Sequence, residues 1–164
     1  MTTRDPQLAH LDRRGRARME DVGDKDVTSR QATARGVLRC SPAAYRTLIE
    51  GGNPKGSVEQ VARVAGIMAG KRTGELIPLC HQLPAASIEV DIDPVAELPG
   101  LEVTATAKVN APTGVEMEAL TAVSVALLTA YDMLKAADRG MRIESIRLLE
   151  KSGGRSGEWR AADR

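Results

Sequence analysis

TGVEMEALTAVSVALLTAYDMLKAADR, residues 113–139, is the longest uninterrupted helical pattern in the chain, and we expect the other elements to be organised around it. Thr113 and Glu116 have the spacing of a capping box, and Gly140 follows where a helix is expected to stop. Ala, Val and Leu fill the middle of the stretch and leave it almost no polar face. We therefore expect a core helix that is buried on most sides.

Four charged residues interrupt this apolar stretch: Glu116, Glu118, Asp132 and Lys135. Each needs a partner, a solvated cleft or a shifted pKa, because burial of an unpaired charge is costly. Asp132 and Lys135 lie one turn apart and can pair directly. Glu118 and Asp132 are separated by about 21 Å of helix, which is too far for one small substrate to touch both. If both ends serve one site, a second, antiparallel copy of the helix must supply one of them.

The composition is that of one soluble globular domain without a strong electrostatic footprint. The chain has 164 residues, of which 42% are hydrophobic, and a formal net charge of +1. Tyr45, Tyr131 and Trp159 are its only aromatic side chains, too few for the base-stacking platforms of most single-strand binders. We therefore disfavour nucleic acid and anionic membranes as partners.

Cysteine and histidine usage argues against disulfides and metal sites. Cys40 and Cys80, in a chain without a signal peptide, favour free thiols in a reducing cytoplasm. The longest apolar run is too short and too interrupted to span a bilayer. A zinc site would need Cys40, Cys80, His81 and His10, which have no recognised ligand spacing, so we expect no metal site.

The first half of the chain predicts one strand and two helices. A strand is expected over Thr33–Cys40, followed by a helix over Pro42–Glu50 with Ser41 as its cap. Ser57 and Gln60 form another capping-box pattern at the start of a second, amphipathic helix. The apolar side of this second helix is expected to comprise Val58, Val61, Ala65 and Met68.

Two features in this half have more than one interpretation. Lys55 precedes the second helix, where amides and the helix dipole favour an anion, although this feature alone is more typical of a solvated surface lysine. The stretch Leu76–Pro84 is apolar but too rich in proline for a regular element, so we expect it to line a pocket or pack under a partner. His81 lies in this stretch, and by spacing alone it is more typical of a core or hinge residue than of a catalyst.

The second half predicts a hairpin, the core helix and a last strand. Apolar and polar residues alternate over Ile88–Asp93 and Leu101–Val109, which indicates two antiparallel strands with one wet face. The last strand follows Gly140, and a phase change predicts a bulge near Glu144 or Ser145. With the two adjacent helices as one crossover, the order is βαββαβ. We predict an α+β, ferredoxin-like sandwich with helices on one face of a four-stranded antiparallel sheet.

The expected domain organisation has three parts. Residues 1–20 are polar and charged and predict a flexible N-terminal arm. Residues 21–151 form the single ferredoxin-like domain, and residues 152–164 form a glycine-rich, basic C-terminal tail. This tail is either a flexible terminus or a backbone nest that closes over phosphates together with Lys151 and Arg155.

Three stretches of the chain closely resemble one protein family. KGSVEQVARVAGIMAGKRTGELIPLCHQL (55–83), TGVEMEALTAVSVALLTAYDMLKAADRGM (113–141) and KSGGRSG (151–157) are similar to the MoaC family of cyclic pyranopterin monophosphate synthases, which act in molybdenum cofactor biosynthesis. The resemblance extends over residues 21–160. It implies a ferredoxin-like catalytic domain and a homohexamer, built as a trimer of dimers, with active sites at the dimer interfaces.

The resemblance also implies a reaction and its residues. The substrate is expected to be 3′,8-cyclo-7,8-dihydroguanosine 5′-triphosphate, made by an upstream radical S-adenosylmethionine enzyme, and the products cyclic pyranopterin monophosphate and diphosphate. Asp132 and Lys135 match the family's catalytic pair. The positions that match its substrate contacts are Lys55, Leu79, Cys80, His81, Glu116, Met117, Glu118 and Lys151. No motif requires a cofactor or metal, and Mg²⁺ bound with the triphosphate is left open.

These residue types suit that chemistry. Ring opening and closure require several proton transfers, for which a lysine and an aspartate with shifted pKa values are suited. Lysines and helix-terminal amides stabilise a leaving diphosphate. A carboxylate at Glu118 matches the paired N–H donors of a guanidine-like edge, whereas Glu116 is either a helix cap or a ligand contact. A non-catalytic ligand sensor and an RNA-binding module of similar topology are the alternatives.

Overall fold

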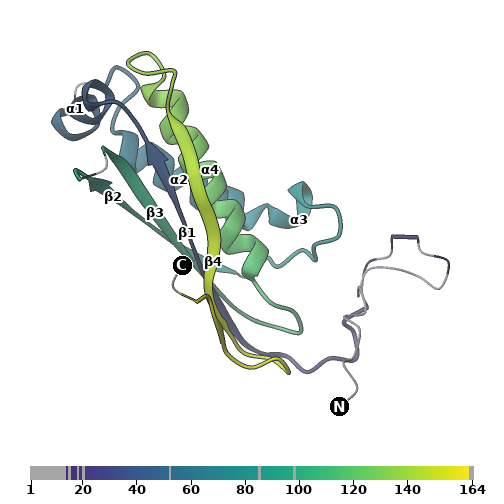
Figure 1. The fold of residues 1–164 in the computed structure, drawn as a ribbon. Coiled ribbons are helices and arrows are strands. Elements are labelled where there is room, and N and C mark those ends of the chain that lie inside the picture. The colour runs from purple at the N-terminus through teal and green to yellow at the C-terminus, as the bar shows by residue number, and fades with distance from the viewer. Residues whose placement is uncertain are drawn as a thin grey trace.

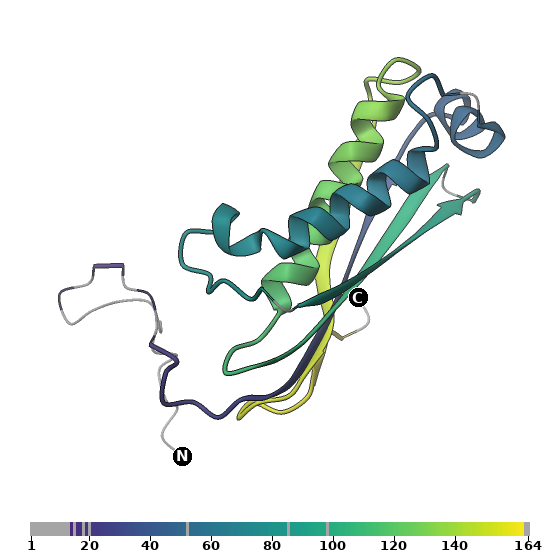
Figure 2. The same cartoon turned by 180° about the vertical axis from the view of Figure 1, so that it is seen from behind.

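An antiparallel sheet covered on one face by helices makes up the structure (Figures 1 and 2). The computed structural model describes residues 21–51, 53–84, 86–97 and 99–162, together with Arg14, Arg16, Ala17 and Met19. The expected N-terminal arm, residues 1–20, therefore lies almost entirely outside the described residues. The elements are β1 (Thr28–Arg39), α1 (Pro42–Glu50), α2 (Val58–Lys71), α3 (Thr73–Leu76), β2 (Ser87–Val95), β3 (Gly100–Ala111), α4 (Glu116–Leu134), β4 (Arg142–Ser152) and β5 (Trp159–Arg160).

The strand order is β2-β3-β1-β4-β5, and every neighbouring pair is antiparallel. Its first four strands have the arrangement of a ferredoxin-like sandwich, so the predicted fold class is confirmed. The sheet has five strands rather than the expected four. After Ser152 the chain turns back through three glycines with positive φ within residues 153–157, and Trp159 then pairs with Lys151. Glycine adopts such φ values without steric cost, which allows the reversal.

β1 lies at the centre of the sheet and begins earlier than expected. It pairs with β3 along its whole length, so it starts at Thr28 rather than at Thr33. On its helix-facing side Ala32, Ala34 and Leu38 have no exposed surface. The short side chains of Ala32 and Ala34 let α4 approach the sheet closely.

The predicted hairpin, first helix and bulge are confirmed. β2 and β3 pair antiparallel throughout. α1 begins after Ser41, whose Oγ accepts a hydrogen bond from the Ala44 amide at 3.3 Å. In β4 the register against β1 shifts beside Ser145, which has a φ of 56°. An extra residue at such a bulge changes which face the following side chains occupy, and this explains the phase change in the sequence.

α4 is the core helix, as predicted. Ala119, Ala122, Val123, Ala126 and Leu127 have no exposed surface. By length and composition alone α4 would also suit a bilayer span, but 56% of that stretch is buried inside the fold. A helix buried to this extent is a core helix of the fold.

The C-terminal end of α4 comes earlier than expected. The helix ends at Leu134 instead of continuing to Arg139. Asp138 gives the physical reason, because its Oδ2 accepts from the Ser41 amide and its Oδ1 from the Gly140 amide, both at 2.7 Å. These bonds tie the chain to the start of α1, and the two amides lower the pKa of the Asp138 carboxyl.

α2 packs on α4 through a different face from the predicted one. Its buried residues are Val58, Ala62, Gly66, Ala69 and Gly70. Two members of the predicted apolar side, Val61 and Met68, are instead 41% and 50% exposed. The prediction followed the spacing of the larger apolar side chains. In the structure the smallest residues of α2 face α4, because they allow the two helices to pack closely. A second apolar stripe of α2 is therefore left uncovered in the single chain.

Enlarging Gly66 will destabilise the fold. A Cβ here would lie 2.9 Å from the Ala122 carbonyl oxygen and 3.1 Å from Ala126 Cβ, so a leucine forces α2 away from α4. We expect Gly66→Leu to lower the free energy of unfolding by about 1–3 kcal/mol, net of the gain from removing a helical glycine. Urea denaturation measures the change, and Lys71→Leu at the exposed end of α2 is the control. A Gly66→Leu protein as stable as the parent would contradict the close packing.

Candidate active site

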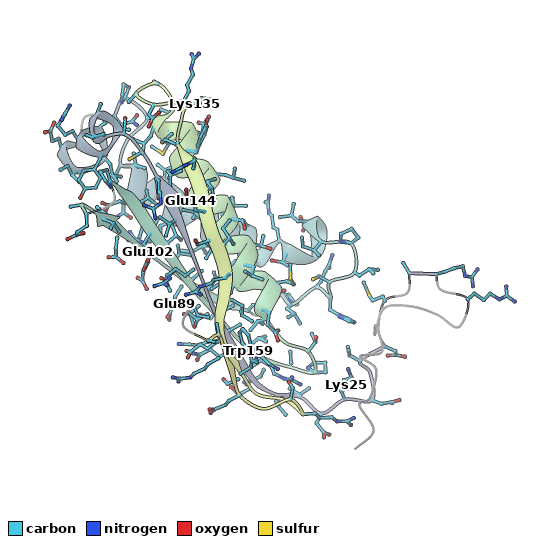
Figure 3. All side chains as sticks on the ribbon, in the orientation of Figure 1. Lys25, Glu89, Glu102, Lys135, Glu144 and Trp159 are labelled. Carbon is cyan, nitrogen blue, oxygen red and sulfur yellow. The ribbon has the colours of Figure 1, made fainter. Side chains whose placement is uncertain are left out.

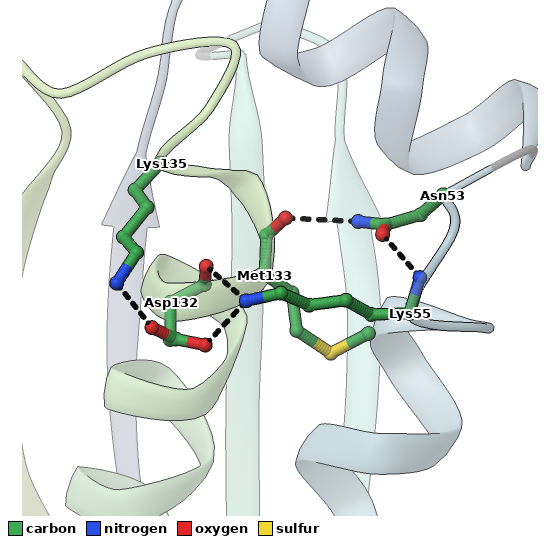
Figure 4. Close-up of polar contacts among 5 residues, drawn as sticks. All are labelled: Asn53, Lys55, Asp132, Met133 and Lys135. Atoms are coloured by element: carbon green, nitrogen blue, oxygen red, sulfur yellow. Dashed lines mark hydrogen bonds and ion pairs between the residues drawn. The ribbon is translucent and has the colours of Figure 1, made fainter.

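A carboxylate held between two lysines lies at the C-terminal end of α4 (Figure 4). Lys135 Nζ is 2.6 Å from Asp132 Oδ1, and Lys55 Nζ is 2.8 Å from Asp132 Oδ2. Lys135 follows the last residue of α4, whereas Lys55 comes from the loop that precedes α2. The predicted pairing of Asp132 with Lys135 is confirmed. Lys55, which by its position alone was more typical of a solvated surface lysine, is half exposed and also forms this ion pair.

The two lysines keep Asp132 ionised. Hydrogen bonds from Lys135 and then from Lys55 lower the pKa of Asp132 to about 2. All three side chains are about half exposed, at 53% for each lysine and 54% for Asp132. The cluster is therefore a charged group that stays paired at neutral pH and that a ligand from solvent can reach.

The loop between α3 and β2 lines a small pocket at the other end of α4. This pocket has a volume of about 170 Å³. Its lining residues are Leu79, Cys80, His81, Leu83, Thr113, Gly114, Glu116, Met117 and Glu118. The expectation that Leu76–Pro84 lines a pocket is confirmed. The pocket brings together six of the eight predicted substrate-contact residues, all except Lys55 and Lys151.

Glu116 faces this pocket and does not cap the helix. α4 begins at Glu116 after Val115 with no side-chain cap, so the predicted capping box with Thr113 was wrong. The Glu116 carboxylate lies over Gly114, where a side chain would collide with it. Gly114 thus leaves the room that lets the carboxylate turn toward the pocket.

Glu118 is the buried charge of the small pocket. Glu118 is only 4% exposed. Desolvation, followed by the nearby charge of Glu116, raises the pKa of Glu118. Burial and then the charge of Glu118 raise the pKa of the Cys80 thiol. Cys80 is therefore kept as a neutral thiol, which makes it a contact residue and a poor nucleophile.

The raised pKa of Glu118 makes stability depend on pH in a defined direction. A carboxyl that binds its proton more tightly in the folded state stabilises at low pH, and this contribution is lost as pH rises past 4.5 through the folded-state pKa. Glu118→Gln stays neutral, so its Tm will rise relative to that of the parent between about pH 4 and pH 8. Thermal unfolding measures this, with Glu89→Gln on the exposed face of β2 as control. A Tm difference that is constant with pH contradicts the raised pKa.

A larger, basic pocket adjoins the small one beyond the N-terminus of α4. It has a volume of about 490 Å³ and shares Thr113, Gly114 and Glu116 with the small pocket. Among its other lining residues are four cations and two glycines with positive φ, namely Lys25, Arg30, Lys151, Arg155, Gly153 and Gly154. These four cations outnumber the two carboxylates of the lining, Asp26 and Glu116, so the pocket suits an anion. Successive backbone amides around such glycines also form anion-binding concavities.

Two buried polar atoms in the wall of the basic pocket lack a partner. Within the described part of the chain, Thr28 Oγ1 and Arg30 Nε have no hydrogen-bond acceptor or donor, although Arg30 Nη2 donates to the Pro112 carbonyl at 3.2 Å. Buried polar groups are normally satisfied, so atoms of this kind mark a place for a ligand or water. The N-terminus of α4, which has no side-chain cap, borders the same pocket and adds positive potential.

Sequence reasoning missed Lys25, Thr28 and Arg30 as site residues. Arg30 lies in phase with the buried Ala32 and Ala34, so it occupies the helix-facing side of β1. An arginine in phase with a buried strand face is a signal for a buried cation site. It was missed because the strand was expected to begin only after Arg30.

The lysine–aspartate cluster and the two pockets lie at opposite ends of the molecule. Figure 3 shows Lys135 at one end and Lys25 at the other. α4 has 19 residues and is therefore about 28 Å long. One chain thus brings the predicted catalytic pair together with Lys55, and the other predicted residues together with each other, but it does not join the two groups.

Metal ligands do not gather in the described part of the chain. No group of three or more His, Cys, Asp or Glu side chains there could hold a metal ion. Cys40 and Cys80 are free thiols. His10, the fourth residue considered for zinc, lies outside the described residues. The alternative that Mg²⁺ binds together with the triphosphate stays a prediction.

The structure is an α+β, ferredoxin-like sandwich in which a pocket with a buried carboxylate adjoins a basic pocket at one end of the core helix. The model of the MoaC family matches residues 19–154, and the chain belongs to this family. It is 61% identical over 156 residues to a protein from Methylobacterium nodulans, covering 95% of this chain and 98% of the relative. A protein from Chloroflexus aggregans is 58% identical over 153 residues, or 93% of each chain. Both relatives carry the name cyclic pyranopterin monophosphate synthase.

Proposed function

We propose that this chain converts 3′,8-cyclo-7,8-dihydroguanosine 5′-triphosphate into cyclic pyranopterin monophosphate, with release of diphosphate, in molybdenum cofactor biosynthesis. Membership of the MoaC family and the shared name of its relatives support this activity. The observation that carries it is the pair of adjoining pockets at the N-terminal end of α4. One pocket holds the buried carboxyl of Glu118 beside the half-buried Glu116, and the other holds cations, as suits a guanine-derived nucleotide triphosphate.

The two pockets divide the substrate between them. Glu118, with Glu116 beside it, accepts hydrogen bonds from the guanidine-like edge of the ring system. The phosphates lie against Arg30, Lys151 and the amides at the N-terminus of α4. Arg30 Nε, which has no hydrogen-bond partner among the described residues, is a further donor in the wall of this pocket.

Asp132, Lys135 and Lys55 carry out the chemical steps. The opening of one ring and the closure of another need groups that donate and accept protons, and Lys135 is placed to exchange them with help from Asp132. Two ammonium groups on one carboxylate leave a net positive charge, which offsets the charge that develops on the leaving diphosphate.

Both ends of α4 serve one active site only if two copies of the chain combine. An antiparallel partner brings its lysine–aspartate cluster to the pockets of the first copy. Apolar side chains left exposed on α2 and α4 support a further interface, since Val61, Val64, Met68 and Leu128 are 41–57% exposed. We therefore propose a homohexamer, built as a trimer of dimers, with active sites between dimer partners.

The substrate must come from an enzyme that forms a carbon–carbon bond between ribose and guanine, for which a radical S-adenosylmethionine enzyme is suited. The free thiols Cys40 and Cys80 suit a reducing cytoplasm as the place of reaction.

Turnover by the purified protein tests the proposed function. The protein is incubated with the cyclic dihydro-GTP substrate, and diphosphate release is followed together with pterin fluorescence after oxidation. Stoichiometric release of both products supports the synthase. Binding of the nucleotide without release of either product would instead favour a ligand sensor.

A further inference from the structure

The side chain of Asn53 connects the loop between α1 and α2 to the C-terminal end of α4 (Figure 4). Its Nδ2 donates to the Met133 carbonyl at 2.8 Å. Its Oδ1 accepts from the Lys55 backbone amide at 2.9 Å. One amide group therefore contacts both α4 and the backbone of the residue that reaches Asp132.

The two bonds fix the orientation of the Asn53 amide. A carbonyl accepts only from the nitrogen end and a backbone amide donates only to the oxygen end, so a flipped amide would lose both bonds. The Met133 carbonyl is among the last four of α4, which have no partner within the helix. Lys55 Nζ donates to the neighbouring carbonyl, that of Asp132, at 3.3 Å. Asn53 and Lys55 thus satisfy adjacent carbonyls at this helix end.

Lys55 needs such an anchor because its own side chain is long and half exposed. A lysine loses substantial rotamer entropy when its ammonium is held in one place. The loop around it contains Gly51 and Gly56, both with positive φ, and so has backbone freedom that other residues would restrict. A turn from the Asn53 carbonyl to the Gly56 amide, at 2.9 Å, fixes the loop locally but does not reach α4.

We infer that Asn53 is a positioning residue, which docks this loop on the end of α4 and so holds Lys55 against Asp132 in the catalytic cluster. The inference rests on the proposed function for its effect on catalysis, because Lys55 acts there beside Lys135. The docking itself is a property of the fold. Asn53 has no part in the chemistry and acts through Lys55.

A double-mutant cycle tests this role. Asn53→Ala in the parent will lower kcat by about 10- to 100-fold, because a misplaced cation near the reacting centre is costly. In a Lys55→Ala background the same change will alter kcat by less than about twofold, because the group that Asn53 positions is gone. Equal fold-losses in the two backgrounds would overturn the inference. They would mean that the losses of kcat from Asn53→Ala and Lys55→Ala simply multiply, as expected if Asn53 acts only on general stability.

A third variant separates the docking bond from the local turn. Asn53→Ser keeps an oxygen that can accept from the Lys55 amide but is too short to reach the Met133 carbonyl. It must therefore behave like Asn53→Ala, and recovery of activity by serine would overturn the inference. Ser57→Ala, which removes the cap of α2 in the same loop, controls for loop stability and will lower Tm without the loss of turnover.

A measurement without turnover keeps the inference separate from the proposed function. Carbon-detected NMR titration of Asp132 in the full chain reports its pKa, which Lys135 and Lys55 both lower. Asn53→Ala will raise this pKa toward the value in Lys55→Ala. No change would overturn the docking role even if the parent is an active synthase, and a raised pKa in a protein without turnover would support docking while the proposed function fails.

Discussion

Lys135→Ala will lower kcat by about 10²- to 10⁴-fold, which is the range for loss of a general acid or base. The cause is loss of the ammonium that lies 2.6 Å from Asp132 Oδ1, since Lys55 approaches the opposite carboxylate oxygen and cannot occupy the same place. Nucleotide affinity will change much less, because the proposed contacts to the ring system and the phosphates come from the two pockets and not from Lys135. Single-turnover kinetics together with equilibrium binding separate these two effects.

Lys108→Ala is the matched control for Lys135→Ala. Lys108 is also about half exposed, at 49%, and pairs with a carboxylate, Glu89, at 3.8 Å on the sheet. Its removal will leave kcat within about twofold, because an isolated exposed ion pair contributes little. If Lys135→Ala weakens binding and leaves the rate of the bound complex unchanged, Lys135 is a binding residue and the assignment of the catalytic pair is wrong.

The sequence was most informative where one physical signal dominated. Strict alternation of apolar and polar residues located β2 and β3, and the apolar run of residues 119–128 located α4 as the core helix. Proline in a longer apolar stretch correctly indicated that the loop carrying His81 lines a pocket. In each case a local pattern determines the local structure, so the inference needs no knowledge of distant contacts.

Predictions from the sequence were less accurate where contacts with residues distant in the chain determine the bounds or the packing of an element. The end of α4 depends on Asp138 reaching the amide of Ser41, which is 97 positions earlier in the chain. The buried face of α2 depends on how closely Gly66 approaches α4, and periodicity cannot report that distance. Arg30 was missed because the length of β1 follows from its pairing with β3. The role of Asn53 likewise appears only when its loop meets Met133.

Two inactive variants will restore activity when they are assembled together. Lys135→Ala damages the catalytic cluster, and Lys151→Ala damages the basic pocket at the other end of the molecule. If each site takes its cluster from one copy and its pockets from the other, a mixed dimer has one site with both defects and one intact site. Random assembly in equal amounts then gives about one quarter of the parent activity, since half of the dimers are mixed.

Co-expression of differently tagged Lys135→Ala and Lys151→Ala chains, followed by turnover of the purified mixed assembly, is the most direct test of the shared active site. The control is Lys135→Ala assembled with Asp132→Asn, two defects at the same end, which will stay inactive. We expect recovery to about one quarter of parent activity only for the pair from opposite ends. Activity of that mixed assembly no higher than that of either variant alone would contradict a site built from two copies.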